Sequence, residues 1–585
     1  MKHFLTLKDF FIKHKWRYII GIVWLIAVDV LQLILPKILG AFTDDLKNQS
    51  ITTKSMILYG LSIIAVAFFM FLFRYLWRMY VMGTARFLEY KLRSDLFAHF
   101  QKLSTNYYNH HKVGDLMAHA TNDINAVRMA AGPGIVMIFD TLVLLSATIF
   151  MMVQTISVKL TIIALLPLPF MALLTSHFGK LIHQRFRKAQ ESFSHLTENV
   201  QENVSGIRVI KAFVQEQEEI KKFTHANQDY VDKNMELVRI QAIFNPLVQF
   251  ISGLSFLIVL AYGGILVINR QITLGDFVAF NSYLGLLTWP IMAIGWVINI
   301  LQRGSASMSR LNEIFATEPE IVDHPQLVDP DLTTIQGEIE FNHLSFTYPG
   351  TTKEVLSDIN IRIPQGKTLA IVGKTGSGKT TLVNLLVRLY DVSTGMIKID
   401  GRDIKSYPLE VLRQHIGYVP QDNFLFSTTI RENIGFGLDH YTQEQVEKAA
   451  DDAQVLDNIK DFPAQFDTLL GERGVTLSGG QKQRVSIARA LIKNPSILIL
   501  DDSLSAVDTK TEEAILKRLH ELMKNRTSII IAHRISTLKE ADEIIVLDEG
   551  KIVERGTHGH LMELQGHYYD LYQKQLLEEM IANQI

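Results

Sequence analysis

The residues best able to do chemistry form a glycine-rich loop in the second half of the chain. The apolar stretch TLAIV at 368–372 is followed by GKTGSGKT at 373–380 and then by the helix-like TLVNLLVRL. Glycines let backbone amides close around phosphate, a lysine can reach the β and γ phosphates, and a hydroxyl can ligate magnesium. In this strand, loop and helix order, the pattern predicts a nucleotide site with the positive helix end facing the anion. The candidate residues are Gly373, Lys374, Thr375, Gly376, Ser377, Gly378, Lys379, Thr380 and Thr381.

A second apolar strand supplies a carboxylate for a metal site. ILIL at 497–500 runs directly into Asp501. A carboxylate at the end of a strand next to a phosphate loop is placed to hold magnesium in nucleotide-binding α/β domains. Thr380 and Asp501 are therefore the candidate Mg²⁺ ligands, with ATP as the nucleotide.

A further anion site is predicted between these two motifs. In LSGGQKQRVSIARAL, residues 477–491, Ser478 can cap a helix whose glycine-flanked N-terminus offers backbone amides to another phosphate. The candidate residues of this site are Ser478, Gly479, Gly480 and Gln481.

The elements that must carry these motifs divide the chain into two chemically different parts. The chain has 585 residues, of which 20% are charged, and its mean hydropathy of +0.15 is too apolar for a protein that lies wholly in water. The apolar excess lies before about residue 302, and the boundary is expected near 320–336. The net charge of −2 and the absence of cysteine argue against a nucleic-acid partner, disulfides, thiolate metal sites and cysteine catalysis.

Long runs without Asp, Glu, Lys or Arg predict six membrane spans. A buried helix of a soluble protein rarely stays uncharged for about 18 residues, which disfavours that alternative. The first run contains Asp29, Pro36 and Lys37 and is counted because the rest of it is strongly apolar. The runs are Tyr18 to Leu39, Ser55 to Phe73, Thr141 to Val158, Leu160 to Gly179, Ile240 to Asn269 and Phe277 to Gln302.

Basic residues before the first span and after the second predict that these sides are cytosolic. An even number of spans then returns the second half of the chain to the cytosol, where ATP is available. Residues 1–17 are expected to form an amphipathic elbow and 18–320 a transmembrane domain. Long cytosolic extensions of that domain are expected at about 83–130 and 180–240. A linker at 321–336 then leads to a nucleotide-binding domain at 337–585. The expected location is the cell membrane. The loops on the outside, at 157–159 and 269–276, are short.

Four charged residues lie within or at the ends of the predicted spans. Asp29, Arg74, Arg78 and Asp140 could bind a cationic substrate or could form an intramembrane ion pair that fixes helix packing. Trp289 and Trp296 on the sixth span could likewise stack on apolar compounds or serve in packing. The residues alone leave both alternatives open.

Taken together, LSGGQ, the phosphate loop and ILILDD resemble the ABC ATPases, and the six spans before them resemble bacterial heterodimeric multidrug ABC exporters. The resemblance implies that Tyr348 in FTYPG stacks on adenine, Gln421 in YVPQD senses magnesium, and His533 in IIIAHR contacts the γ phosphate. It also implies that Asp508 belongs to a dimer-spanning loop and that GERG at 471–474 touches the cytosolic helix turns.

The family further implies that two ATP-binding domains close head to tail, each nucleotide lying between one chain's phosphate loop and the other chain's LSGGQ. Short turns near 113–118 and 211–216 are expected to transmit this motion, and the spans alternate between inward- and outward-facing states.

One residue departs from the family pattern. ABC ATPases with full activity carry a glutamate after the magnesium-binding aspartate, where this chain has Asp502. A carboxylate misplaced by about 1 Å can lower a rate roughly a hundredfold. Asp502 therefore predicts slow hydrolysis at this chain's own loop, unless a small shift or a longer water bridge compensates. Because LSGGQ is intact, a non-identical partner that carries the glutamate is expected.

The function predicted is ATP-driven export of amphipathic small molecules, including drugs, by one half of a heterodimer. A lipid or lipopeptide flippase and a nucleotide-gated channel or regulator are the alternatives. The six spans argue against a soluble ABC ATPase, and the fusion of spans to an ATPase in one chain argues against an importer.

Overall fold

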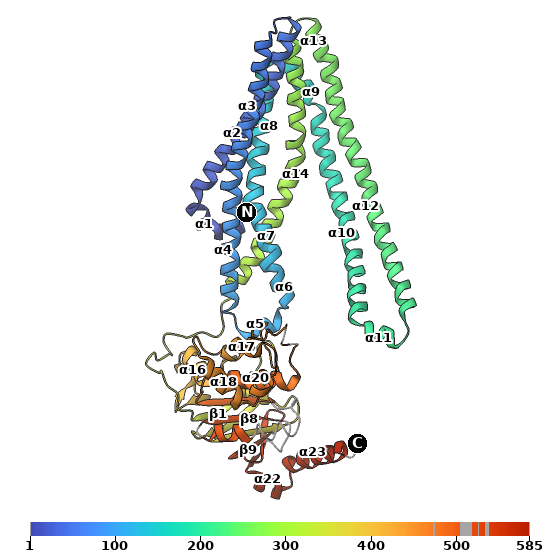
Figure 1. Cartoon of the computed structure of the whole chain (residues 1–585). Coiled ribbons are helices and arrows are strands. Elements are labelled where there is room, and N and C mark those ends of the chain that lie inside the picture. The colour runs from blue at the N-terminus through green and yellow to red at the C-terminus, as the bar shows by residue number, and fades with distance from the viewer. Residues whose placement is uncertain are drawn as a thin grey trace. The chain divides into compact units, whose positions relative to one another are not determined.

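The computed structural model describes residues 2–471, 474, 476–503, 517–524, 526–532 and 538–583. The chain divides into two compact units (Figure 1). The first unit contains residues up to 101 and 113–317, and the second contains 102–112 and the residues from 318 onward. The predicted fold class is confirmed, since apolar helices make up the first unit and an α/β fold makes up the second.

Six continuous helical stretches in the described residues are long and apolar enough to cross a membrane, and they contain the six predicted runs. Some are interrupted by single π-helical turns, such as η2 (Arg78–Met82), η3 (His119–Asp123), η4 (Ala130–Gly134) and η5 (Val259–Gly263). The helices of the first unit are α1 (Lys8–Lys13), α2 (Lys15–Lys47), α3 (Thr53–Trp77), α4 (Gly83–Phe100), α6 (Val113–Ala118), α7 (Ile124–Met129), α8 (Ile135–Thr155), α9 (Val158–Leu165), α10 (Pro167–Ser205), α11 (Ile207–Ala212), α12 (Glu216–Ile258), α13 (Gly264–Ile268) and α14 (Leu274–Ala316).

Side-chain caps stabilise the first turns of the helices that follow the short loops. The Thr52 hydroxyl accepts a hydrogen bond from the Ser55 amide at the start of α3, and Thr273 and Asp276 form a reciprocal capping box at the start of α14. Such caps satisfy amides that have no partner within a helix. The chain can therefore reverse direction in a few residues.

Two groups of helices make up the first unit. The helix α2 packs against α3, α8 and α14, whereas α10 and α12 lie along each other and are joined by α11 (Figure 1). Leu33, Met152, Phe280 and Tyr283 are buried in the membrane core, and the Tyr283 hydroxyl donates to the Leu33 carbonyl at 2.9 Å.

The charged residues of the predicted spans do not form the ion pair that was one of the two alternatives. Asp29 is 1% exposed and its side chain lies beside that of Asp140, with Arg74 near both. Among the described residues, no ion pair within 4 Å joins either carboxylate to Arg74 or Arg78. The tryptophans Trp289 and Trp296 contact each other edge to face, with ring centroids 5.3 Å apart.

The second unit is built on two sheets in the described part of the chain. A smaller sheet has the order β2-β1-β4-β5, and a larger one has the order β10-β9-β3-β8-β7-β6, in which β9, β3, β8, β7 and β6 are parallel. The strands are β1 (Ile339–Thr347), β2 (Glu354–Ile363), β3 (Thr368–Gly373), β4 (Ile397–Ile399), β5 (Arg402–Asp403), β6 (Ile416–Val419), β7 (Ile497–Asp501), β8 (Thr527–Ile531), β9 (Glu543–Asp548) and β10 (Lys551–Gly556).

The inner strands of the larger sheet are mostly apolar, as is usual for a parallel sheet that is covered on both faces. Every residue of β7 and β8 is buried. Ala370 of β3 pairs with Ile530 of β8 on one side and with Ile544 of β9 on the other. The helices of this unit are α5 (Thr105–His110), α15 (Lys379–Leu386), α16 (Leu409–His415), α17 (Ile430–Gly435), α18 (Gln443–Asp452), α19 (Leu456–Lys460), α20 (Gly479–Leu491), α22 (His558–Leu564) and α23 (His567–Asn583).

Candidate nucleotide-binding site

The glycine-rich loop lies at the carboxyl end of β3, between that strand and the N-terminus of α15. Ligands of open α/β sheets bind at this edge. Gly376 and Gly378 have φ angles of +84° and +99°, which glycine adopts without strain. A Cβ at Gly378 would lie 2.8 Å from Leu356 Cδ2, whereas a Cβ at Gly376 would meet nothing within 4 Å. The loop therefore packs against the protein on one side and is open on the other.

The first turn of α15 can receive an anion. Its N-cap is Gly378, and no side chain caps the helix. The amides of such a first turn have no partner within the helix and carry partial positive charge. Ser377, just before this turn, is 3% exposed, and its hydroxyl has no hydrogen-bond partner. A buried polar atom of this kind indicates that the loop is built for a polar ligand.

Lys379 is folded back over the loop. It is 7% exposed, and its Nζ donates to the carbonyls of Gly373 and Lys374, both at 2.8 Å. Burial lowers the pKa of the Lys379 ammonium, while the nearby carboxylates of Asp501 and Asp502 oppose this shift. The cation is thus held at the loop before a phosphate arrives.

The two consecutive carboxylates follow β7 in different backbone conformations. Asp501 is the last residue of the strand and is 1% exposed. Asp502 has a φ angle of +46°, and its amide donates to the Ile531 carbonyl of β8 at 2.8 Å. Aspartate tolerates this left-handed region better than most residues. The turn fixes the direction in which the short Asp502 side chain leaves the sheet.

Tyr348 lies beside the phosphate-loop helix. It follows β1, its hydroxyl is 2.9 Å from the Thr381 hydroxyl, and its ring meets the Tyr390 ring edge to face at 5.1 Å. The predicted Tyr348 and Thr381 are therefore in direct contact. Gln421, two residues beyond the end of β6, is exposed.

This combination of spans and nucleotide loop was compared with known proteins. Residues 18–291 match the family model described as ABC transporter transmembrane region, and residues 356–505 match the model described as ABC transporter. The chain is 44% identical over 569 residues to the probable multidrug resistance ABC transporter ATP-binding/permease protein YheI of Bacillus subtilis (strain 168), with 97% of each chain covered. This chain is a half-size ABC exporter.

Two further similarities agree with this assignment. The chain is 37% identical over 494 residues to the ATP-dependent lipid A-core flippase of Syntrophus aciditrophicus (strain SB), covering 84% of this chain and 81% of the flippase. It also resembles the structure of a bacterial Atm1-family ABC exporter with ATP bound, with a TM-score of 0.77, 28% identity, and 96% and 98% of the two chains covered. The exporter is therefore a multi-pass membrane protein with an ATPase domain coupled to transport.

The predicted second anion site begins with a side-chain cap. Ser478 caps α20 as predicted, since its hydroxyl accepts from the Gln481 amide at 3.3 Å while the Ser478 amide donates to Gln481 Oε1 at 2.9 Å. This reciprocal capping box stabilises the start of a 13-residue helix.

The donor set of the phosphate loop fits magnesium. Thr380 and Asp501 offer oxygen ligands, and Mg²⁺ is usually held by one or two carboxylates together with substrate phosphates and water. No group of three or more His, Asp or Glu side chains that could hold a metal occurs in the described residues.

The sequence did not predict the contacts that α5 and the residue before it make within the second unit. Asn109 of α5 donates through Nδ2 to the Tyr390 hydroxyl at 2.7 Å, and Ser104 and Asn106 donate to the Glu320 carboxylate at 3.0 and 2.8 Å. Residues 113–118, where a turn was predicted, form α6 in the first unit, whereas α5 packs with the ATP-binding unit. Isolated Asn and Ser residues carry no periodic signal that could have located these contacts.

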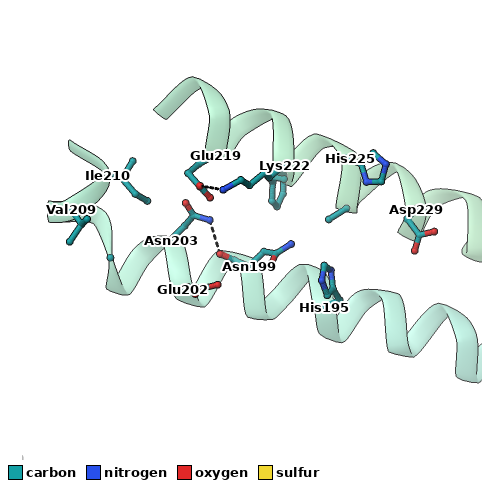
Figure 2. Close-up of a pocket in the computed structure, with 13 residues that line it drawn as sticks. His195, Asn199, Glu202, Asn203, Val209, Ile210, Glu219, Lys222, His225 and Asp229 are labelled. Carbon is teal, nitrogen blue, oxygen red and sulfur yellow. Dashed lines mark hydrogen bonds and ion pairs between the residues drawn. The ribbon is translucent and has the colours of Figure 1, made fainter. Parts of the chain in front are cut away.

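Some predicted residues lie outside the described part of the chain, namely Glu472 and Arg473 of the GERG element, Asp508 and His533. A cavity of about 800 Å³ between α10 and α12 is separate from the nucleotide loop because it belongs to the first unit (Figure 2). Two of its polar side chains bind each other, since Lys222 Nζ donates to the Glu219 carboxylate at 2.6 Å.

Proposed function

We propose that this ABC exporter moves amphipathic small molecules, including drugs, out of the cell as one half of a transporter with two non-identical chains. The observation that carries the two-chain part is Asp502, which directly follows Asp501 where full activity needs a glutamate. The multidrug part is supported by the similarity to a probable multidrug resistance transporter. The ATP-binding unit and residues 1–17 are assigned to the cytosolic side.

The chain's own residues would act on ATP as follows. The amides of Gly373 to Thr381 bind the phosphates, Lys379 leaves the two carbonyls it now contacts to neutralise the β and γ phosphates, and Tyr348 stacks on adenine. Magnesium, held by Thr380 and Asp501 with Gln421 close by, would supply charge neutralisation at the phosphates when bound. His533 contacts the γ phosphate.

Asp502 is the residue that would orient and polarise the attacking water. Its side chain is one methylene, about 1.5 Å, shorter than glutamate. Because the hydrogen bond from its amide to Ile531 fixes the turn, the backbone cannot easily advance to make up this length. The loop of this chain would hold ATP with slow turnover, on the order of a hundredfold below a glutamate site.

The intact LSGGQ of this chain would complete the second nucleotide site with the partner's phosphate loop. Ser478, Gly479 and Gly480 and the first-turn amides of α20 would face the γ phosphate there. Gln481 now occupies the Ser478 amide, so closure on a nucleotide would release this contact.

The test is Mg²⁺-dependent ATPase activity of this chain alone and of the chain co-expressed with candidate partners. The proposal expects negligible turnover alone and strong turnover in the right pair. Asp502→Glu should raise the turnover of the pair when the partner's own glutamate is inactivated. Vigorous activity of the lone chain, with no change on Asp502→Glu, would rule out the asymmetric mechanism.

Lipid transport is the second candidate, favoured by the similarity to a lipid A-core flippase. Inside-out vesicles that contain the assembled pair separate the candidates. Uptake of a fluorescent cationic drug supports drug export, and ATP-dependent movement of a labelled lipid without drug uptake supports flipping. ATP-dependent ion conductance without either would instead indicate a channel or regulator.

A further inference from the structure

The N-terminal elbow is fixed to the helices below the membrane. Leu7 and Phe10 are 7% and 4% exposed and share a core with Leu88 and Leu92 of α4 and with Met308 of α14. Asn312 of α14 also donates to the His3 carbonyl at 2.9 Å. The elbow is therefore a rigid part of the first unit, and side chains at its end have defined neighbours.

At the end of the elbow, basic side chains lie beside one exposed aromatic ring of α4. The Arg17 guanidinium lies 5.0 Å from the centroid of the Phe87 ring, and the His14 ring is parallel to that ring at 6.4 Å. Phe87 itself is 51% exposed. Lys13 and Lys91 lie close enough to act on His14, whose pKa is lowered first by burial and then by the positive charges of Arg17, Lys13 and Lys91.

Among the described residues, no ion pair within 4 Å involves Lys13, Arg17 or Lys91. Glu89 of α4 is already bound by Arg86 at 2.8 Å, Arg93 at 2.9 Å and Arg128 at 3.3 Å. Like charges brought together without a counter-ion are unfavourable, so the cluster is suited to bind an external anion.

The cluster lies where water meets lipid. The apolar run of the first span begins at Tyr18, directly after Arg17. Around the cluster, apolar and aromatic side chains are left exposed: Ile12 by 52%, Trp16 by 66% and Ile19 by 46%. Exposed tryptophan beside basic residues at the end of a span is typical of the interfacial region of a bilayer.

We propose that Lys13, His14, Arg17 and Lys91 form a binding site for the headgroup of an anionic phospholipid in the inner leaflet. The headgroup phosphate lies among the four basic side chains, and the acyl chains lie along the exposed apolar side of the first span. A basic residue close to a membrane surface contributes about fivefold to the binding of an anionic lipid, which corresponds to about 1 kcal/mol.

The bound lipid would also stabilise the cytosolic ends of the spans. The elbow shares its core with α4, α7 and α14, including Ile124 and Val127 of α7. A ligand that binds only the folded arrangement raises its apparent stability by mass action. Phosphatidylglycerol should therefore raise the thermal unfolding midpoint of the transporter, whereas phosphatidylcholine should not.

The experiment is native mass spectrometry of the intact transporter in detergent, titrated with phosphatidylglycerol or phosphatidylcholine. The variant Lys13→Gln/Lys91→Gln removes two charges and leaves Arg17 on Phe87. The control Lys47→Gln/Lys54→Gln removes two exposed charges, one at the far end of α2 and one at the start of α3. The expected result is preferential binding of phosphatidylglycerol by wild type and control, and a loss on the order of 25-fold in the variant.

Three results would overturn the proposal: equal binding of the two lipids by wild type, unchanged phosphatidylglycerol binding in the variant, or an equal loss in the control. If the variant does not fold, the wild type is titrated at low and high salt. An electrostatic site then loses phosphatidylglycerol as salt rises, and binding that does not respond to salt counts against it. This test needs neither a known substrate nor the proposed asymmetry, so its failure would leave the proposed function standing.

Discussion

The two helices at the predicted phosphate sites of this exporter begin in opposite ways. The helix α15 starts at Gly378 with no side-chain cap, whereas α20 starts with the reciprocal capping box of Ser478 and Gln481. Both N-termini carry partial positive charge, but only the start of α20 is capped by side chains, which bind the Gln481 and Ser478 amides. In the proposed mechanism, α15 would take up ATP within one chain, whereas α20 would give up the bond between Gln481 and the Ser478 amide when a nucleotide binds on assembly.

The largest expected effect is the loss of ATP binding by the lone chain on Lys379→Ala. Lys379 is buried at the loop and offers a charge-assisted hydrogen bond to phosphate, so affinity should fall roughly 10- to 100-fold. Equilibrium binding of a fluorescent ATP analogue measures this. Lys374→Ala is the control, because the Lys374 side chain is exposed. If both variants lost ATP affinity equally, Lys379 would have no special role in binding phosphate.

The next largest effect is a loss of stability that differs between the packed and the open side of the phosphate loop. Gly378→Ala should destabilise the ATP-binding unit by about 1–2 kcal/mol for the left-handed backbone, plus the cost of the overlap with Leu356. Gly376→Ala meets open space and should show only the backbone cost. Thermal unfolding of the full chain in detergent compares the two. Equal destabilisation would mean that the loop is not packed on one side only.

A smaller effect distinguishes the two helix starts directly. Ser478→Ala should cost about 1 kcal/mol of stability by removing the cap, and should lower ATPase turnover of the assembled transporter without weakening ATP binding by the lone chain. Thr442→Ala is a matched control because Thr442 forms the same capping box with Gln445 at the start of α18. If Thr442→Ala lowered turnover as much, the loss would be one of stability alone.

The smallest effect tests how the phosphate-loop strand is anchored. Asp542 accepts from Lys367 Nζ and from the Thr368 amide, both at 2.8 Å, at the start of β3. Burial works to raise the pKa of Asp542, but these two donors outweigh it, and the net pKa is lowered. The stabilisation should therefore be complete above the unfolded pKa of about 4 and be lost as the pH falls through the lower folded value.

This prediction is checked by thermal unfolding at several pH values with Asp542→Asn. The variant should be less stable than the wild type near neutral pH, and the difference should shrink at acidic pH. A difference that does not change with pH would contradict the ionic origin of the contact.

Local patterns in the sequence accounted for much of this protein. The charge-free runs predicted the six membrane helices because a lipid environment excludes charge along a continuous stretch of chain. The glycine spacing predicted the strand, loop and helix at 368–386, and Ser478 predicted the start of α20, because a cap and a tight turn depend on residues a few positions apart.

Other features depended on which segments come together in three dimensions. The sequence gives no sign that α5 packs with the ATP-binding unit, that Asn109 meets Tyr390, or that Arg17 lies over the Phe87 ring. Nor does it show that Asp29 lies beside Asp140 without an ion pair. These contacts join residues far apart in the chain, so no local period or motif records them. The sequence therefore determined the elements and the chemistry of the loop, and only the tertiary structure decided their neighbours.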